Sequence, residues 1–247
     1  MHMGGTALYL AAQMVLSKAR AIAAHLLQAD ASEVSFSAGH FTVGDSERSI
    51  GLLALAEAAR DPANLPANWP GGMSPGLDAD AYNDSDVFTF PNGCHAAEIE
   101  IDPETGAVRL ERYLAIDDYG RLINPMLTIG QVQGGVAQGI GQALLEHTVY
   151  EAPSGQLLSG SFQDYALPRA DDLPPLDITL AELPTTVNRL GVKGAGQAGC
   201  MAAPQTIINA ILDALAPLGI EHVDMPGSPE RIWRAIRRAG SSGRGAA

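Results

Sequence analysis

The feature that most restricts the fold of this chain is a segment rich in glycine and glutamine, GQVQGGVAQGIGQ, at residues 130–142. The apolar spacing around it predicts a helix from Leu127 to Glu146. The glycines inside that helix are Gly134, Gly135, Gly139 and Gly141. Each interior glycine lowers the stability of the helix by up to about 1 kcal/mol relative to alanine. This cost is offset only if another group packs closely against the helix. We therefore expect another backbone or a bound group to lie against this helix.

Two interpretations of the segment stay open from the residues alone. In the first, the glycines let a second helix pack closely, and Gln131, Gln133 and Gln138 are solvated or cap the helix. In the second, the segment contacts a cofactor. An amide such as Gln138 offers a hydrogen-bond donor and an acceptor without adding charge, which suits a polar heterocycle or an oxo ligand.

A second glycine-rich segment, GVKGAGQAGC, occupies residues 191–200. Such a loop offers backbone N–H groups to an anion, and Lys193 adds a positive charge. Gly194, Gly196 and Gly199 also fit the G-x-G-x-x-G pattern of dinucleotide-binding turns, which is a weak signal on its own. The chain left after Gly199 is too short for the remaining strands of a doubly wound domain, so a nicotinamide-dependent dehydrogenase is a distant alternative.

The composition favours a cytoplasmic globular protein that binds neither nucleic acid nor membranes. With 247 residues and 46% hydrophobic content, the chain can bury a core as one large or two small domains. Its net charge of -13 repels phosphate backbones and anionic lipids alike. The apolar stretch at residues 7–16 is too short to span a bilayer. Two cysteines, Cys94 and Cys200, do not make a disulfide framework, which fits a reducing compartment.

Periodicity predicts an α+β fold of mixed helices and largely antiparallel strands. Four helices join the one described above, at residues 6–28, 47–60, 204–215 and 228–238. Strands are expected at residues 33–37, 40–43, 86–90, 94–101, 108–116, 148–151 and 178–183. The turn Asp102 to Gly106 should close an antiparallel hairpin, because proline presets φ and glycine accepts a positive φ.

Proline-rich sequence marks the main division of the chain. Four prolines fall between Pro62 and Pro75, which predicts a loop or crossover there. We expect a helix-rich N-terminal subdomain at residues 1–61, a connection at 62–80, a C-terminal subdomain at 81–239 and a disordered Gly/Ser tail at 240–247.

Other polar groups give weaker signals. Asp117 and Asp118 end a predicted strand, and we expect a solvated turn with an Asx-type hydrogen bond rather than a metal or acid–base site. Asp164 has the same interpretation. His95 beside Cys94 has no second His or Cys at ligand spacing, so we expect ordinary strand residues and no zinc site.

Six segments in one order nevertheless resemble a single family, the molybdopterin-binding large subunits of the xanthine dehydrogenase, aldehyde oxidase and carbon monoxide dehydrogenase superfamily. The matching segments are NGCHAAEIEIDPETG (92–106), DDYGRLINP (117–125), GQVQGGVAQGIGQALLE (130–146), DYALPRADDLP (164–174), GVKGAGQAGC (191–200) and PQTIINAILDAL (204–215). The resemblance implies the α+β fold of the second molybdopterin-binding domain of these enzymes, and it covers the C-terminal portion of their subunit.

The resemblance also implies a cofactor and a reaction. Molybdenum would be held through a pterin dithiolene rather than by protein ligands, in bacterial members often as the cytosine dinucleotide, and would hydroxylate an aldehyde or N-heterocycle with oxygen from water. Electrons would leave through iron–sulfur clusters and FAD carried only by partner chains. By position, Gln138 is similar to the glutamine near the apical molybdenum ligand. The other residues placed at the cofactor by the resemblance are Gly134, Gly135, Gly139, Lys193, Gly194, Ala195 and Gly196.

Two departures from the family pattern matter. The family's glutamate base, which deprotonates a metal-bound hydroxyl, corresponds to Gln197, and an amide has no useful basicity. The family subunit is also several times longer, and the opening MHMGGTALYLAA resembles the middle of a domain. We therefore expect a split-gene subunit, a truncated reading frame or an excised part, whose partners are the N-terminal half of the large subunit, an iron–sulfur subunit and an FAD subunit. A non-catalytic fragment that acts as an interaction partner is the alternative.

Overall fold

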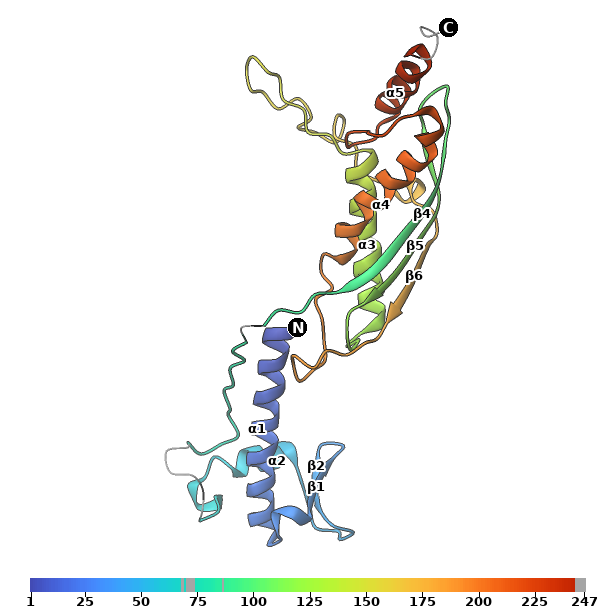
Figure 1. Ribbon diagram of the computed structural model, residues 1–247. Helices are drawn as coiled ribbons and strands as arrows, with labels where there is room; N and C mark the ends of the chain where they lie inside the picture. Colours follow the sequence, from blue (N-terminus) through green and yellow to red (C-terminus); the bar gives the residue numbers. More distant parts are fainter. Residues whose placement is uncertain (68, 70–73, 86, 243–247) are drawn as a thin grey trace. The chain divides into compact units, whose positions relative to one another are not determined.

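The computed structural model describes residues 1–67, 69, 74–85 and 87–242 (Figure 1). The chain divides into two compact units, Met1–Asp86 and Val87–Ala247. Each is described by itself below.

The first unit is a long helix with a small antiparallel sheet. Its elements are α1 (His2–Leu27), β1 (Val34–Ser37), β2 (His40–Val43), β3 (Ser49–Gly51) and α2 (Leu52–Ala58), with short 3-10 turns η1 (Ala31–Glu33) and η2 (Pro62–Asn64). The strands lie in the order β1-β2-β3. Ile22, Phe41 and Leu55 are fully buried between the helices and the sheet. The C-terminal half of α1 therefore contributes to the core of this unit through Ala19 and Ile22, whereas Leu8 in its N-terminal half is 72% exposed.

One prediction in the first unit is partly wrong. The helix expected at residues 47–60 begins only at Leu52, because Ser49–Gly51 forms the edge strand β3. Ser49, Ile50 and Gly51 pair with residues 40–42 of β2, so the sheet takes the backbone hydrogen bonds of this segment. The two strands predicted at residues 33–37 and 40–43 are confirmed.

The second unit packs two helices on one face of a three-stranded sheet. The strands are β4 (Asn92–Ile101), β5 (Val108–Asp118) and β6 (Leu176–Ala181), and the helices are α3 (Pro125–Leu144), α4 (Ala198–Leu215) and α5 (Pro229–Ser242), with 3-10 turns η3 (Ala170–Asp172) and η4 (Ala216–Leu218). β5 lies between β4, antiparallel to it, and β6, parallel to it. Figure 1 shows α3 and α4 side by side against the sheet. The core between these layers contains Tyr113, Val136, Ile140, Ile207 and Ile211.

The predicted hairpin is confirmed in its details. The carboxylate of Asp102 accepts hydrogen bonds from the Glu104 N–H at 2.9 Å and from the Thr105 hydroxyl at 2.6 Å. Gly106 has φ +74°, the conformation that the sequence required at this turn. The α+β class with mostly antiparallel strands is likewise confirmed.

Four predictions in the second unit need correction. Residues 87–90 form no strand, and Asp86 lies outside the described residues. Residues 148–151 contribute only an isolated bridge between Tyr150 and Leu157. The helix expected to start at Pro204 starts at Ala198, and α5 continues to Ser242, past the expected start of the tail.

Pro204 lies inside α4, and α3 leaves room for its ring. Because proline favours the first turn of a helix, the sequence predicted a helix start at Pro204. In the structure the Pro204 ring lies against Gly139 of α3, where a side chain would leave no room for it.

None of the helices within the described ranges is long and apolar enough to cross a membrane.

Candidate functional site

The end of β5 places two consecutive carboxylates inside the protein. Asp117 and Asp118 are only 3% and 6% exposed, so the expected solvated turn is wrong. The expected Asx-type bond is present, since the Gly120 N–H donates to Asp118 Oδ1 at 2.8 Å. The rest of their surroundings comes from residues distant in sequence, which local turn chemistry does not reveal.

Asp118 anchors the second glycine-rich segment. Its carboxylate forms an ion pair with the ammonium group of Lys193, and the side chains of both residues are largely buried. It also accepts a hydrogen bond from the Leu183 N–H at 3.2 Å. Backbone bonds support the same junction, because the Lys193 N–H donates to the Tyr119 carbonyl at 2.8 Å. The charge of Lys193, expected at an anionic ligand, is therefore engaged in holding the loop.

The electrostatics of Asp118 follow from these contacts. Burial alone would raise the pKa of its carboxyl group. The hydrogen bond from Lys193, the N–H groups of Gly120 and Leu183, and the charge of Lys193 together outweigh burial and hold the pKa of Asp118 below its ordinary value. Asp118 is thus a permanent anion at neutral pH, and the pair with Lys193 carries no net charge.

Asp117 is the centre of a second buried network. His95 Nε2 lies 3.1 Å from Asp117 Oδ1, and His95 Nδ1 lies 2.7 Å from the hydroxyl of Tyr113. Tyr119 donates its hydroxyl proton to Asp117 Oδ2 at 2.7 Å. Gly93 permits this arrangement, because a Cβ there would meet Asp117 Oδ1 at 1.9 Å. His95 is therefore a paired interior residue rather than an ordinary strand residue.

The network shifts the acidity of its members in opposite directions. Burial would raise the pKa of Asp117, but hydrogen bonds from His95 and Tyr119 outweigh it and lower that pKa. Burial raises the pKa of Tyr113 to about 12, against a hydrogen bond with Thr206. At neutral pH the network therefore combines a carboxylate with neutral phenols.

The glycines of α3 and α4 bring the two helices into close contact. A Cβ on Gly139 would lie 2.5 Å from the Cβ of Ala203, and one on Gly135 would lie 2.9 Å from the backbone nitrogen of Cys200. On the facing helix, a Cβ on Gly199 would lie 2.6 Å from the Val132 carbonyl oxygen. The close approach that Gly135 and Gly139 allow is thus to α4, as in the packing interpretation of the segment.

Gln131 joins the two glycine-rich segments. Its side-chain Nε2 donates to the Gly196 carbonyl at 2.6 Å. Gln197 follows as the N-cap residue of α4, with an exposed side chain that makes no capping bond. Among the described residues, the backbone N–H groups of Gly194, Ala195 and Gly196 donate to no carbonyl in the loop or its surroundings. Uncharged donors therefore gather beside Gln197.

Gln138 and Gly134 lie on the part of the α3 surface that is exposed to solvent. Both residues are exposed, and no atom lies within 4 Å of a Cβ built on Gly134. Gln138 is seven residues after Gln131, two helical turns along the same face. The predicted residues thus divide into two groups. Gln138, Gly134, Gly194, Gly196 and Gln197 are exposed, whereas Gly135, Gly139, Lys193 and Ala195 contact other parts of the fold.

Three residues with direct structural roles at this site were missed as site residues. Gln131, Asp118 and His95 all act through partners at least 18 positions away in sequence. The sequence carried one usable signal: Gln131 precedes Gln138 by a heptad, which places both amides on one helix face. Nothing local marked Asp118 as the partner of Lys193.

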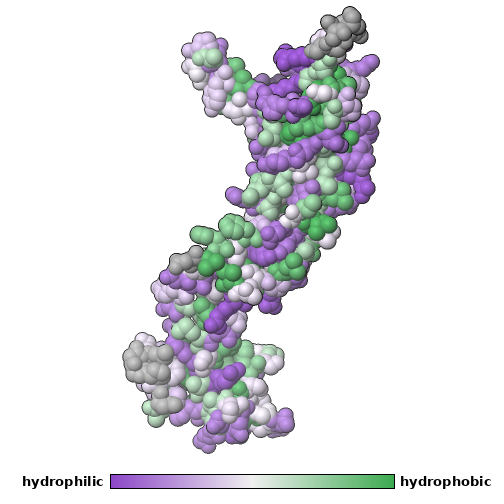
Figure 2. All heavy atoms as spheres, in the orientation of Figure 1, coloured by the Kyte–Doolittle hydropathy of each residue, from purple (hydrophilic) through white to green (hydrophobic). Residues whose placement is uncertain are grey.

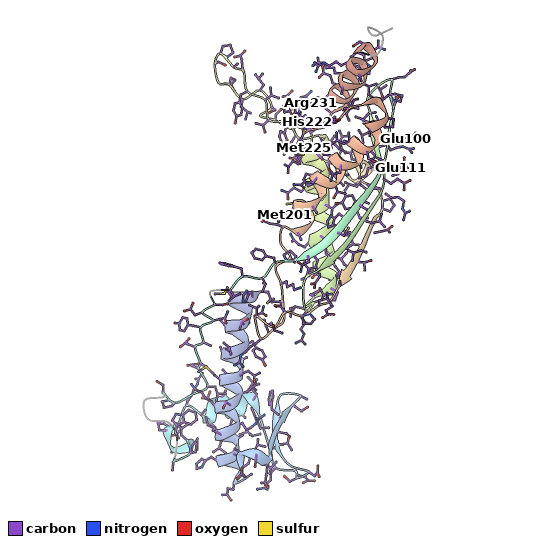
Figure 3. The ribbon with its side chains drawn as sticks, in the orientation of Figure 1. Glu100, Glu111, Met201, His222, Met225 and Arg231 are labelled. Carbon is purple, nitrogen blue, oxygen red and sulfur yellow. The ribbon has the colours of Figure 1, made fainter. Side chains whose placement is uncertain are left out.

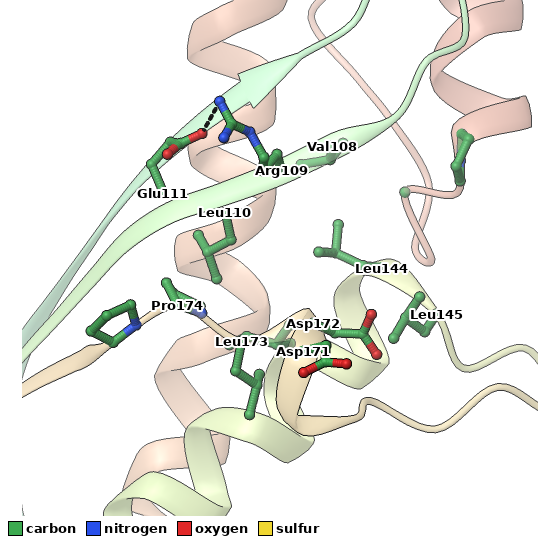
Figure 4. Close-up of a pocket in the computed structure, with 14 residues that line it drawn as sticks. Val108, Arg109, Leu110, Glu111, Leu144, Leu145, Asp171, Asp172, Leu173 and Pro174 are labelled. Atoms are coloured by element: carbon green, nitrogen blue, oxygen red, sulfur yellow. Dashed lines mark ion pairs between the residues drawn. The ribbon is translucent and has the colours of Figure 1, made fainter.

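Two cavities flank these elements. A cavity of about 140 Å³ is lined by His95, Asp117 and the first turn of α4, with Met201 on that helix labelled in Figure 3. A larger one of about 480 Å³ lies at the far end of α3, between Leu110, Leu144 and Leu173 with Asp171 and Asp172 at its side (Figure 4). No group of three or more His, Cys, Asp or Glu side chains able to hold a metal occurs within the described part of the chain.

Comparison with known proteins gives a consistent result. Residues 1–174 match the family model described as a molybdopterin cofactor-binding domain. The chain is 36% identical to the nicotine 6-hydroxylase large subunit of Paenarthrobacter nicotinovorans, over 92% of this chain and 28% of that protein. It is 33% identical to the carbon monoxide dehydrogenase large chain of Hydrogenophaga pseudoflava, over 94% of this chain and 28% of that protein.

Solved structures agree with these sequence matches. The reconstituted CO dehydrogenase from Oligotropha carboxidovorans superposes with a TM-score of 0.83 at 31% identity, over 96% of this chain and 29% of that chain. Quinoline 2-oxidoreductase from Pseudomonas putida 86 superposes with a TM-score of 0.78 at 35% identity, over 92% and 28%. The chain therefore spans somewhat more than a quarter of the length of the proteins it matches.

Proposed function

Because this chain belongs to the molybdopterin cofactor-binding domains of molybdenum hydroxylase large subunits, we propose that it forms one wall of a molybdopterin site in a multi-subunit oxidoreductase. The reaction we propose is hydroxylation of an aldehyde or N-heterocycle with oxygen from water. The cofactor contact is assigned to the subdomain at residues 81–239. The resemblance favours the cytosine dinucleotide form of the pterin.

The observation that carries this proposal is that uncharged hydrogen-bonding groups of α3 and of the loop before α4 stay exposed. Gln138 projects from α3, and the N–H groups of the loop 194–196 lie free beside Gln197, with Gln131 linking helix and loop at 2.6 Å. A pterin has several ring donors and acceptors and little charge, so amides and backbone N–H groups suit it. These residues fit the cofactor without a protein ligand to the metal. When bound, the cofactor would supply the redox chemistry.

The resemblance implied that Lys193 contacts the cofactor, whereas we propose a structural role for it. Its ammonium is paired with Asp118 inside the protein, so a phosphate group could use it only by breaking that pair. Removing one partner from a buried ion pair typically costs about 3–5 kcal/mol. We infer that Lys193 acts by fixing the loop, and that backbone N–H groups make the direct contacts.

Gln197 limits what the chain can do chemically. A carboxamide donates and accepts hydrogen bonds but does not take up a proton near neutral pH. We propose that Gln197 orients substrate or a bound hydroxyl group, and that the proton is accepted elsewhere in the complex. A general base typically contributes about 10²- to 10⁴-fold in rate, so the proposal has a measurable consequence.

The partners we propose are the part of the large subunit that this chain does not span, an iron–sulfur subunit and an FAD subunit. The coverage of 28% supports the first of them, because the matched relatives are more than three times as long. The two free cysteines, Cys94 and Cys200, support a reducing, cytoplasmic setting.

Cofactor retention tests the assignment of Gln138. In the complex with the rest of a large subunit, Gln138→Ala should release pterin about tenfold more readily, because a loss of one buried amide contact costs on the order of 1–2 kcal/mol. Gln133→Ala is the matched control, since Gln133 is an exposed glutamine on another side of the same helix. Equal pterin retention in both variants would remove Gln138 from the site.

A second candidate function is favoured by the amide at position 197. A fragment that keeps the fold but lacks the base could act as a non-catalytic interaction partner. The two candidates differ in turnover by the wild-type complex, which only the first predicts. They also respond differently to Gln197→Glu, as set out in the Discussion.

A further inference from the structure

The outer face of the β4–β5–β6 sheet, opposite α3 and α4, changes character along its length. Side chains alternate along β5, so Arg112, Leu114 and Ile116 all point to this outer face. Strand register places Glu98 opposite Arg112, Ala96 opposite Leu114, and Cys94 opposite Ile116. The face can therefore be followed pair by pair from one end to the other.

The end of this face at the start of β5 is charged, and most of its charges are paired. Arg109 forms ion pairs with Glu100 and Glu111, and Arg112 lies 3.6 Å from Asp177 of β6. Figure 3 labels Glu100 and Glu111 near this end of the hairpin. Such cross-strand pairs are typical of a sheet surface that faces water.

The other end of the same face is apolar on β4 and β5, while the neighbouring positions on β6 are polar, with Asp177 beside Leu114 and Thr179 beside Ile116. Cys94, Ala96, Leu114 and Ile116 are all exposed there and carry no charge, and Ile116 is 55% exposed. We call these four residues the apolar end. The start of α3, which follows β5 in the chain, also exposes a large apolar side chain, since Met126 is 74% exposed. In Figure 2, purple side chains predominate around α5, and green side chains are more frequent lower in the second unit.

The apolar end lies next to the candidate cofactor loop. β4 and β5 pair Asn92 with Asp118 at this end of the sheet. Asp118 holds Lys193, and Gly120 bridges to Val192, so the loop 191–197 is attached directly beyond the last strand pair. Large contiguous apolar patches on a soluble domain mark sites of protein interaction.

We propose that the apolar end is the surface on which the remaining part of the large subunit docks. This inference rests on the proposed function. The relatives with which this chain aligns over at least 92% of its length have about 70% of their own length outside the match, so in those proteins the same sheet is part of a much longer chain. Most charges at the charged end already have partners, whereas the side chains of the apolar end are exposed, so the apolar end is the part that the partner covers. A partner docked there would cover one side of the loop 191–197.

Binding in trans tests the surface without cofactor. The probe is the part of the nicotine 6-hydroxylase large subunit of Paenarthrobacter nicotinovorans that precedes the matched segment, and that subunit's own matched segment is the positive control. Calorimetry should give binding of this chain to the probe. Leu114→Thr with Ile116→Thr should weaken it about tenfold or more, because the apolar contact area is lost while strand propensity is kept.

Arg112→Thr is the matched control, because it lies on the same strand and face but in the charged half. Its affinity should stay within about twofold of wild type. Ala96→Glu, a second variant on the neighbouring strand, should weaken binding as the threonine pair does. Unchanged circular dichroism would verify that each variant is folded.

Three results would overturn the proposal: equal affinity for the threonine pair and Arg112→Thr, no binding of this chain where the positive control binds, or a wild-type chain that self-associates through these residues in sedimentation. Since the cofactor is absent from this measurement, a complex that forms but carries no molybdenum would contradict the proposed function and leave the docking surface standing.

Discussion

The ammonium group of Lys193 is bound to the carboxylate of Asp118, 75 positions away in the sequence, and both side chains are largely buried. The pair ties the loop that precedes α4 to the end of β5. From the sequence, the charge of Lys193 was expected to bind an anionic ligand. In the structure it instead holds the loop 191–197 against the end of β5.

Replacing Lys193 should therefore destabilise the protein. Lys193→Met leaves the Asp118 carboxylate buried without its partner, and we expect a loss of about 3 kcal/mol in the free energy of unfolding. The control is Arg112→Met, which removes a largely exposed ion pair with Asp177 and should cost less than about 1 kcal/mol. Urea unfolding of both variants measures the difference. Similar losses in the two variants would contradict the role given to Lys193.

Acid should act through the same carboxylates. The pKa values of Asp117 and Asp118 are lowered in the folded chain, so their contribution to stability is complete above the ordinary value of 3.8. As pH falls below that value, the unfolded chain takes up protons first and stability is lost. Urea midpoints measured from neutral pH to about pH 3 should fall less steeply for Asp118→Asn than for wild type. If the urea midpoint of Asp118→Asn falls with pH as steeply as that of wild type, or more steeply, the pKa of Asp118 is not lowered in the folded chain.

The contacts of the α3 glycines make a paired prediction. Gly139→Ala puts a Cβ 2.5 Å from that of Ala203, and we expect a loss of about 2 kcal/mol. Gly134→Ala meets open space in the same helix and should gain up to about 1 kcal/mol from helix propensity. Thermal unfolding of the two variants should shift in opposite directions. Equal destabilisation would mean that the helices do not meet at Gly139.

The amide at position 197 separates the two candidate functions. If this chain works in an active complex with altered proton transfer, the wild-type complex turns over and Gln197→Glu raises kcat by less than about tenfold. Steady-state kinetics across pH would measure this. An inactive wild type that gains about 10²-fold or more from the acid would instead support the non-catalytic fragment.

Much of the fold could be predicted because its signals are local. The turn Asp102 to Gly106 carries its own hydrogen-bonding residues, and Ala19 and Ile22 of α1, which are both buried, recur at helical spacing. The glycines of α3 correctly indicated a close approach. They could not indicate whether the neighbour was α4 or a cofactor, because either one favours the absence of a side chain.

The site was predicted less completely because its contacts are distant in sequence. The junction of Asp118 with Lys193 and that of Gln131 with Gly196 form only when β5, α3 and the loop are packed. His95 joins Asp117 across the β4–β5 hairpin, where alternation brings both to the inner face. Pair contacts of this kind depend on register, which a single sequence does not specify.

Metal and pterin analysis of the purified complex tests the central claim most directly. When this chain is co-expressed with the remaining part of a large subunit in a host that makes molybdopterin, we predict about one molybdenum and one pterin for each copy of this chain. A complex that forms and is folded but contains neither would contradict the account.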